Sequence, residues 1–291
     1  MTQTANQLLS GKGHTDENFP VASFLIHPRH RAVILAFYRF ARTADDVADH
    51  ETATPDEKLR LLDGMEESLV RHGQVSPEAA SLKAALAGHG LSAEHAIDLL
   101  EAFRRDVRKL RYANWDELMD YCRYSAMPVG RFVLDVHGED RALWPYSDAL
   151  CAALQVINHL QDCAKDYRTL NRVYLPLDLL GRFDIEPEAL RAERASPALR
   201  GVIEELARRT DALLSHARPF AVAIADGRLG LEVAVIQKFA EDLNATLKKR
   251  DPLSQRVHHR KSEALGLAFG AAARFMASRA IRRKAPAALE P

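Results

Sequence analysis

The chain has 291 residues, of which 47% are hydrophobic and 27% are charged, so it can bury one large core. Its 40 basic and 40 acidic residues cancel, and this balance argues against a general nucleic-acid-binding role, which would need a basic excess on one face. Three cysteines without Cys-x-x-Cys spacing argue against a zinc-thiolate site and against a disulfide framework.

Helix signals run along the chain, and convincing alternating strand patterns are absent. Residues 54–57 form a capping box with proline at the first helical position, and residues 114–117 repeat the arrangement of a cap followed by glutamate. Gly88 and Gly227 predict helix ends, and Pro128 predicts a kink because it removes a backbone donor. The predicted helices span residues 28–50, 55–72, 77–87, 92–112, 115–137, 145–170, 197–217, 219–226, 231–249 and 262–284.

These signals predict an all-α fold. We expect a single domain over residues 1–291, with a core at about 15–280 and a disordered tail at 285–291. The polar N-terminus lacks the apolar segment of a signal peptide, which predicts a cytoplasmic protein. The apolar stretch 264–273 is about half of the ~20 residues that span a bilayer, so no transmembrane helix is expected.

Two pairs of aspartates stand four residues apart, Asp45 with Asp49 and Asp162 with Asp166. On a helix each pair shares one face, one turn apart, where like charges repel. Each pair follows an apolar run that suits a buried helix, and buried carboxylates must be paired or metal-bound. Two such turns facing one another would require a divalent cation, and the pattern predicts a magnesium-diphosphate site; either pair alone would more often be a solvated polar face.

The motifs resemble those of the squalene/phytoene synthase family of head-to-head prenyl transferases, over roughly residues 15–280. Residues 42–49 (RTADDVAD) resemble the family's first aspartate motif. Residues 155–166 (QVINHLQDCAKD), followed by 171–176 (NRVYLP), resemble the second. Residues 103–106 (FRRD) and 121–124 (YCRY) lie between them, where the family places an acidic position and a pocket tyrosine.

Within the family, residues 17–23 and 121–131 are similar to the bacterial hydroxysqualene synthase branch of hopanoid-linked squalene synthesis. The chain carries Ser125-Ala126-Met127 where squalene and phytoene synthases usually carry Val-Ala-Gly, which alters one wall of the pocket. The resemblance implies a helical bundle of the isoprenoid (terpene) synthase type with a central cavity. It also implies a carbon-oxygen lyase that ionises presqualene diphosphate and captures the carbocation with water, giving hydroxysqualene and diphosphate.

The resemblance and the chemistry together assign candidate residues. Two or three Mg2+ ions would be held by Asp45, Asp49, Asp162 and Asp166, with Asp46 a further candidate that points about 100° away on the helix. The substrate would contact Arg42, Gln155, Arg172, Tyr174, Phe19, Phe24 and Phe132. Tyr124, Asn158 and Arg131 are the catalytic candidates for holding the quenching water. For each arginine, phenylalanine or amide taken alone, a surface charge or simple core packing is the ordinary alternative.

No glycine-rich phosphate loop or βαβ pattern is visible, and this favours termination by water over hydride transfer from NADPH. The alternatives are a head-to-head prenyl transferase that makes presqualene diphosphate, squalene or phytoene, and a non-enzymatic assembly factor. Intact acidic motifs favour an enzyme. We also expect functional coupling to other squalene-pathway enzymes, and peripheral membrane contact through residues 266–276 and the basic residues after them.

Overall fold

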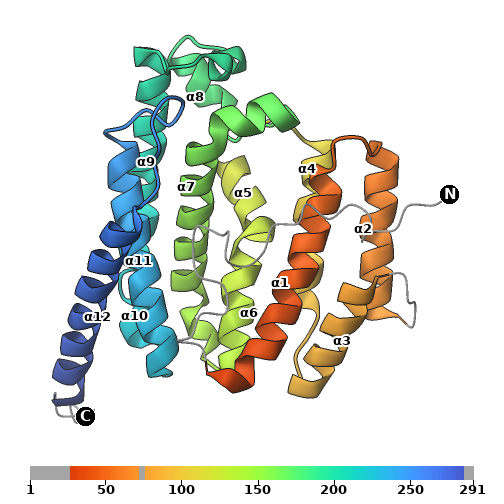
Figure 1. The fold of residues 1–291 in the computed structure, drawn as a ribbon, viewed down its shortest axis with the longest axis vertical. Coiled ribbons are helices and arrows are strands. Elements are labelled where there is room, and N and C mark those ends of the chain that lie inside the picture. Colours follow the sequence, from red (N-terminus) through yellow and green to blue (C-terminus); the bar gives the residue numbers. More distant parts are fainter. Residues whose placement is uncertain (1–26, 72–75, 285–291) are drawn as a thin grey trace.

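The computed structural model describes residues 27–71 and 76–284, and over these ranges the chain forms helices and no strand, which confirms the all-α prediction (Figure 1). The helices are α1 (Pro28–Asp49), α2 (Pro55–Val70), α3 (Pro77–His89), α4 (Glu94–Arg108), α5 (Trp115–Ser125), α6 (Met127–His137), α7 (Trp144–Leu170), α8 (Leu177–Arg182), α9 (Pro197–Ala217), α10 (Phe220–Ala223), α11 (Gly227–Leu247) and α12 (Lys261–Lys284). The predicted tail at 285–291 lies outside the described residues.

Local capping signals set several helix starts. The capping box before α2 is present: the Thr54 side chain accepts from the Glu57 N–H, and the Glu57 carboxylate accepts from the Thr54 N–H at 2.9 Å. The Asn114 side chain accepts from the Glu117 N–H at the start of α5. The bend expected at Pro128 is a full break, because Ala126 leaves the helical conformation between α5 and α6.

Three features differ from the sequence prediction. Helix α3 runs past Gly88 to His89, and Gly90 ends it in the left-handed region at φ 65°, which glycine adopts without strain. Gly227 opens α11 instead of ending the preceding helix, because the Asp226 side chain accepts from the first backbone N–H groups of α11. The short helix α8 and a 3-10 turn at Pro187–Arg191 fill a segment for which no helix was predicted.

Two hydrophobic clusters lie side by side in the bundle. One surrounds α7, which packs against α5, α6, α9 and α11. The other surrounds α1, which packs against α2, α3, α4 and α6. Helix α6 joins them, since Leu134 belongs to the first cluster and Phe132 and Val136 belong to the second. Figure 1 shows α6 between α1 and α7.

A short backbone pairing fixes the segment after α7. Asn171 ends α7 in the left-handed conformation, and Val173 then forms an isolated bridge with Arg111. Backbone N–H groups of Val173 and Leu177 donate to the carbonyls of Leu110 and Tyr112, both at 2.9 Å. The pairing therefore holds residues 172–174 beside the C-terminal end of α4.

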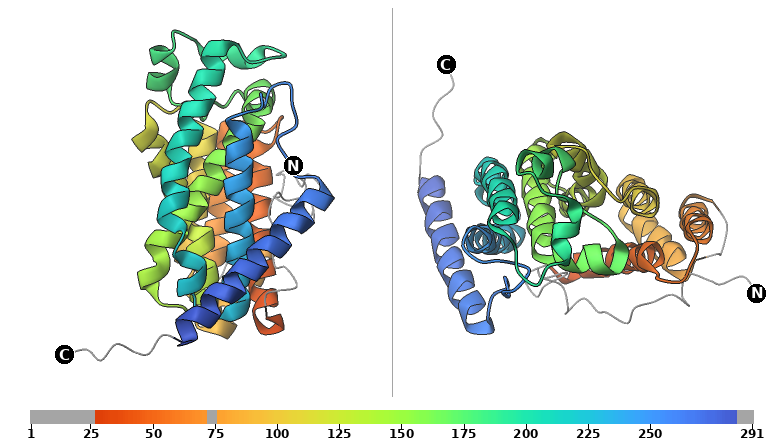
Figure 2. Two further views of the ribbon diagram at one scale, coloured as in Figure 1. Left: turned by 90° about the vertical axis from the view of Figure 1, so that its left-hand side faces the viewer. Right: turned by 90° about the horizontal axis from the view of Figure 1, so that it is seen from above.

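Helix α12 lies on the outside of α10 and α11 (Figure 2). Among the described helices, it alone is long and apolar enough to cross a membrane by length and composition, over Lys261–Ile281. Only 11% of its most apolar window is buried. The apolar stretch 264–273 is followed by Arg274, and the helix continues past that arginine, as the predicted helix over 262–284 does.

Candidate active site

The first acidic motif forms the C-terminal turns of α1. Arg42 pairs with Asp45 at 2.9 Å and with Asp46 at 2.5 Å. Asp46 is buried and faces Arg42, so it is turned away from the line that joins Asp45 to Asp49. Arg42 is therefore already paired with two carboxylates of its own helix.

Asp45 sits in an environment that disfavours its charge. Burial and the neighbouring Asp49 carboxylate raise the pKa of Asp45 to about 8, and Arg42 offsets part of this effect. Asp106 contributes further repulsion from α4. A third of the Asp45 side chain is nevertheless exposed, so the group is open to a ligand that would neutralise it.

The second acidic motif forms the C-terminal turns of α7. Burial and Asp162 raise the pKa of Asp166 to about 7, and Asp49 adds to this rise. Asp49 thus repels a carboxylate on each helix, Asp45 on α1 and Asp166 on α7. The two acidic turns are therefore near enough for their charges to interact.

Arg172 connects the first acidic motif to the segment that follows the second. It is buried, and its guanidinium pairs with Asp49 at 2.5 Å and donates to the carbonyls of Ala48 at 3.2 Å and Asp106 at 3.3 Å. Nearby carboxylates raise its pKa despite the opposing effect of burial, so it stays charged. Arg172, which the sequence predicts to contact the substrate, thus links α1, α4 and the segment after α7; we call this link the Arg172 strut.

A buried polar cluster supports this strut. Asp106 accepts from the Tyr121 hydroxyl at 2.8 Å and from the Tyr174 hydroxyl at 3.0 Å. Burial raises the pKa of Asp106 to about 6, against the lowering effects of Arg172 and both hydroxyls. The His159 ring stacks on Tyr174 with ring centroids 3.5 Å apart, and burial followed by Arg172 lowers its pKa to about 3. His159 is therefore neutral at physiological pH.

The sequence analysis missed His159 as a member of this cluster. The spacing of His159 in the sequence could have identified it, because His159 stands one helical turn after Gln155 on α7. In the structure the two side chains lie 3.2 Å apart. Gln155, a predicted substrate ligand, is thus engaged with this histidine. Asn158 is half-buried on the same helix, between Leu154 and Asp162.

An apolar cavity of about 290 Å³ lies between α1, α6, α7 and α11. Its lining on α1 includes Ile34 and Ala41, and Ala41 lies one turn before Asp45. Its lining on α7 includes Leu154, which lies two turns before Asp162. The cavity and the carboxylates therefore follow the same two helices, with the apolar space at one end and the charges at the other.

Phe132, a predicted contact for the substrate, does line this cavity and stacks on Phe37 with ring centroids 3.9 Å apart. Tyr124 and Arg131 are not among the lining residues. The Arg105 guanidinium lies 4.1 Å from the centre of the Tyr124 ring. Arg131 makes two bonds to Asp148, at 2.8 and 2.5 Å. Phe19 and Phe24 lie outside the described residues.

A basic loop approaches the second motif from the other side. The buried Gln161 side chain donates to the Val257 carbonyl and anchors the loop between α11 and α12 on α7. Burial lowers the pKa of His258 in this loop, while Asp162 opposes the shift, which indicates that the loop lies near that carboxylate. Arg250, Arg256, Arg260 and Lys261 line a polar cavity there with His258, His259 and Glu263.

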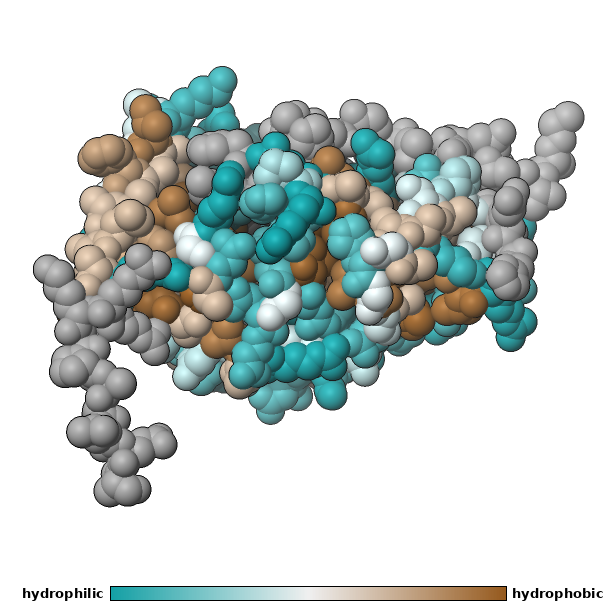
Figure 3. All heavy atoms as spheres, turned by 90° about the horizontal axis from the view of Figure 1, so that it is seen from below, coloured by the Kyte–Doolittle hydropathy of each residue, from teal (hydrophilic) through white to brown (hydrophobic). Residues whose placement is uncertain are grey.

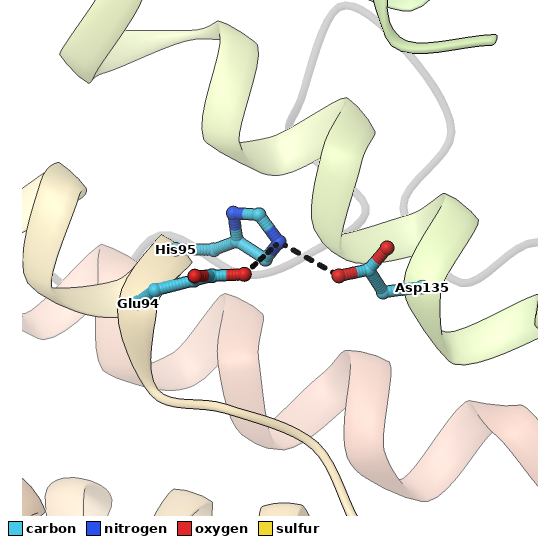
Figure 4. A group of neighbouring side chains, drawn as sticks. All are labelled: Glu94, His95 and Asp135. Carbon is cyan, nitrogen blue, oxygen red and sulfur yellow. Dashed lines mark hydrogen bonds and ion pairs between the residues drawn. The ribbon is translucent and has the colours of Figure 1, made fainter. Parts of the chain in front are cut away.

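A separate cluster of possible metal ligands lies on α4 and α6. His95 Nε2 is 3.1 Å from Asp135 and 3.6 Å from Glu94 (Figure 4). The Arg141 guanidinium contacts both carboxylates, at 2.9 Å and 3.2 Å, and so supplies the positive charge that a metal ion would bring. We interpret this cluster as a tie between α4, α6 and the 3-10 turn at Arg141–Leu143.

Comparisons with known proteins agree with this geometry. The squalene/phytoene synthase family matches residues 12–263. The hydroxysqualene synthase of Rhodopseudomonas palustris is 57% identical over 96% of this chain and 94% of its own, and that of Zymomonas mobilis is 58% identical over 92% and 91%. The crystal structure of squalene synthase HpnC from Alicyclobacillus acidocaldarius is 31% identical and covers 84% of this chain and 92% of its own with a TM-score of 0.71. The chain belongs to the squalene/phytoene synthase family, and its helical bundle is of the isoprenoid synthase type.

Proposed function

We propose that the protein is a hydroxysqualene synthase, which ionises presqualene diphosphate and captures the rearranged carbocation with water. The observation that carries the proposal is the position of Asp49, which repels carboxylates on both acidic helices at one end of an apolar cavity. The hydroxysqualene synthases that are 53–58% identical over nearly the whole chain support the choice of reaction.

The donor set fits Mg2+. Asp45, Asp49, Asp162 and Asp166 offer only carboxylate oxygens, which are the ligands that this ion prefers, and it readily shares its shell with phosphates. Burial and neighbouring carboxylates raise the pKa values of Asp45 and Asp166, and a bound cation would favour the charged form of both. Two or three bound ions would neutralise the charge that collects on the departing diphosphate. Arg42 and the basic loop near Asp162 could add direct contacts to its oxygens.

The apolar cavity suits the prenyl chains and the carbocation. Its lining is mostly aliphatic and aromatic, with Ser147 and Glu232 as polar members, and such a lining would limit the access of bulk water while the cation rearranges. The faces of Phe37 and Phe132 provide electron-rich surfaces there, each worth roughly 0.5–2 kcal/mol to a cation. The substrate's carbon-oxygen bond to diphosphate breaks first; water oxygen then bonds to carbon and releases one proton.

Asn158 is our candidate for holding that water. It stands one turn from Leu154 in the cavity lining and one turn from Asp162, and hence on the boundary between the apolar and charged parts of the site. Tyr124 and Arg131, the other two candidates from the sequence, are engaged with Arg105 and Asp148. Their part in the reaction would require a different arrangement of these side chains.

Product analysis tests the proposal. The purified protein should convert presqualene diphosphate to hydroxysqualene with Mg2+ and without a nicotinamide cofactor, and should give little product from farnesyl diphosphate. Asp162→Asn should lower turnover roughly a hundredfold or more while the fold persists, and the exposed Glu193→Gln should not. NADPH-dependent squalene with no alcohol would point instead to a condensing and reducing synthase. Failure to turn over either diphosphate would favour a non-enzymatic role.

A further inference from the structure

Helix α12 carries the most exposed large apolar side chains among the described residues, and three of them share one face; the fourth, Ile281, is 71% exposed and lies on another side. Phe269 is 78% exposed, Leu265 is 73% exposed and Met276 is 62% exposed. Their spacing of four and seven residues places all three on one side of the helix. In Figure 3, brown and tan surface gathers at the left edge, where the end of α12 lies.

Other side chains of α12 fix the helix to the protein. Phe275 is buried, and a Cβ added to Gly230 on α11 would come within 2.9 Å of its ring, so the helices are in close contact. Arg279 donates to the carbonyls of Ile224 and Ala225, at 3.1 and 2.8 Å. A helix held along one side in this way presents its apolar stripe outward and cannot enter a bilayer end-on without leaving the bundle.

The charges of α12 decide between the possible partners for this stripe. The helix carries six basic residues and one acidic residue; Lys261 begins it, directly after the basic loop residues Arg256 and Arg260, and the other five basic residues lie in its C-terminal half. Arg256, Arg260 and Lys261 are exposed at the start, and Arg282, Arg283 and Lys284 follow in sequence at the end. A second copy of the chain would bring basic ends against basic ends in either a parallel or an antiparallel pairing. An anionic lipid surface complements both the charge and the apolar stripe.

We propose that α12 lies flat on an anionic lipid bilayer, with Leu265, Phe269 and Met276 inserted into the interface. Helix α12 packs on α10 and α11, and those two helices form part of the cavity wall through Phe220, Leu229 and Val233. The bilayer and the apolar cavity would then face opposite sides of one helical layer. The proposal concerns binding to lipid and does not depend on which reaction the site performs.

Flotation of the full chain with lipid vesicles tests this proposal in the absence of substrate. Wild-type protein should float with vesicles of phosphatidylcholine and phosphatidylglycerol, and weakly with phosphatidylcholine alone, and added salt should release it. The triple variant L265Q/F269Q/M276Q should lower the partition coefficient by about tenfold or more, because it removes the inserted apolar area. The single variant F269Q should show a smaller loss in the same direction.

The control is Val70→Gln, which alters a half-exposed apolar side chain on α2 and should leave vesicle binding unchanged. Circular dichroism of each variant identifies any that fail to fold, and F269Q then carries the test. Equal flotation of F269Q, the triple variant and the wild type would overturn the proposal, as would equal binding to neutral and anionic vesicles. A third result would also overturn the proposal. If the wild type sediments as a dimer and does not bind vesicles, and the triple variant is a monomer, the apolar stripe contacts a second copy of the chain.

Discussion

Replacing Asp45 by asparagine should increase the stability of the metal-free protein at high pH while removing activity. The Asp45 carboxyl is repelled by Asp49 one turn away and by Asp106, and its pKa is raised to about 8 from a usual value near 4. Asparagine keeps the shape of the side chain and removes its charge. The same substitution takes away an oxygen ligand from the proposed Mg2+ site, so stability and activity should change in opposite directions.

The sign of the effect depends on pH. A raised carboxyl pKa means that the folded state binds a proton that the unfolded state has released, so wild-type stability falls as pH rises from about 4 through about 8. The asparagine variant lacks this dependence. The two proteins should therefore be most similar in stability near pH 4, where Asp45 is largely protonated in the folded and the unfolded wild type alike, and should differ increasingly as pH rises to 9.

The magnitude follows from the local geometry. Two carboxylates about 6 Å apart repel by ~0.7 kcal/mol in water and by ~3 kcal/mol at an effective dielectric constant of 20. Arg42, at 2.9 Å from Asp45, offsets part of this repulsion, and a third of the Asp45 side chain is exposed to screening solvent. We expect Asp45→Asn to gain about 1–2 kcal/mol in the free energy of unfolding at pH 9.

Urea unfolding at several pH values between about 4 and 9 in the presence of a chelator measures this difference. Glu193→Gln is the matched control, because it makes the same chemical change on an exposed carboxylate and should alter neither profile. Added Mg2+ should stabilise the wild type at pH 9 and stabilise Asp45→Asn less. The reasoning would be refuted if Asp45→Asn were no more stable than the wild type at pH 9, or kept the wild-type slope with pH.

Two further substitutions test the strut and the cavity. Arg172→Met should cost about 3–5 kcal/mol in urea unfolding, because Asp49 then loses its partner within a buried network; a cost below ~1 kcal/mol would contradict the structural role. Gly130→Ala should destabilise the protein by about 1–3 kcal/mol and lower kcat/KM, because its Cβ would lie 2.3 Å from Ser147 Oγ and 2.6 Å from Cys151 Sγ. Gly88→Ala is the control: the position has open space around it, so this change should not lower the free energy of unfolding. Equal thermal midpoints for the two alanine variants would count against the close approach of α6 and α7.

The sequence predicted the acidic helices because helical spacing alone places Asp45 over Asp49 and Asp162 over Asp166. The same spacing distinguished Asp46, which the structure turns toward Arg42. Capping residues worked in the same way, since Thr54 and Asn114 bond backbone groups only three residues away. Predictions of this kind succeed because the interacting groups are close in sequence.

Contacts between distant segments could not be read in this way. The sequence predicted Arg172 as a substrate contact, and it could not show the pairing of residues 110–113 with the segment after α7, which places Arg172 beside Asp49. His159 gave no sign of stacking on Tyr174, because that contact depends on the left-handed turn at Asn171. The exposure of α12 was equally hidden, since the same apolar composition would suit a buried helix.

The packing of the cavity also fixes the spacing of the charges. The stack of Phe37 on Phe132 holds α1 against α6, and the missing side chain of Gly130 lets α6 approach Ser147 and Cys151 on α7. The separation of α1 from α7 is thus set through α6 by residues that line the apolar space. Because Asp45 and Asp162 continue the same two helices, a substitution that widens or narrows the cavity also moves the opposed carboxylates. The volume available to the prenyl chains and the spacing available to the metal ions are therefore mechanically coupled.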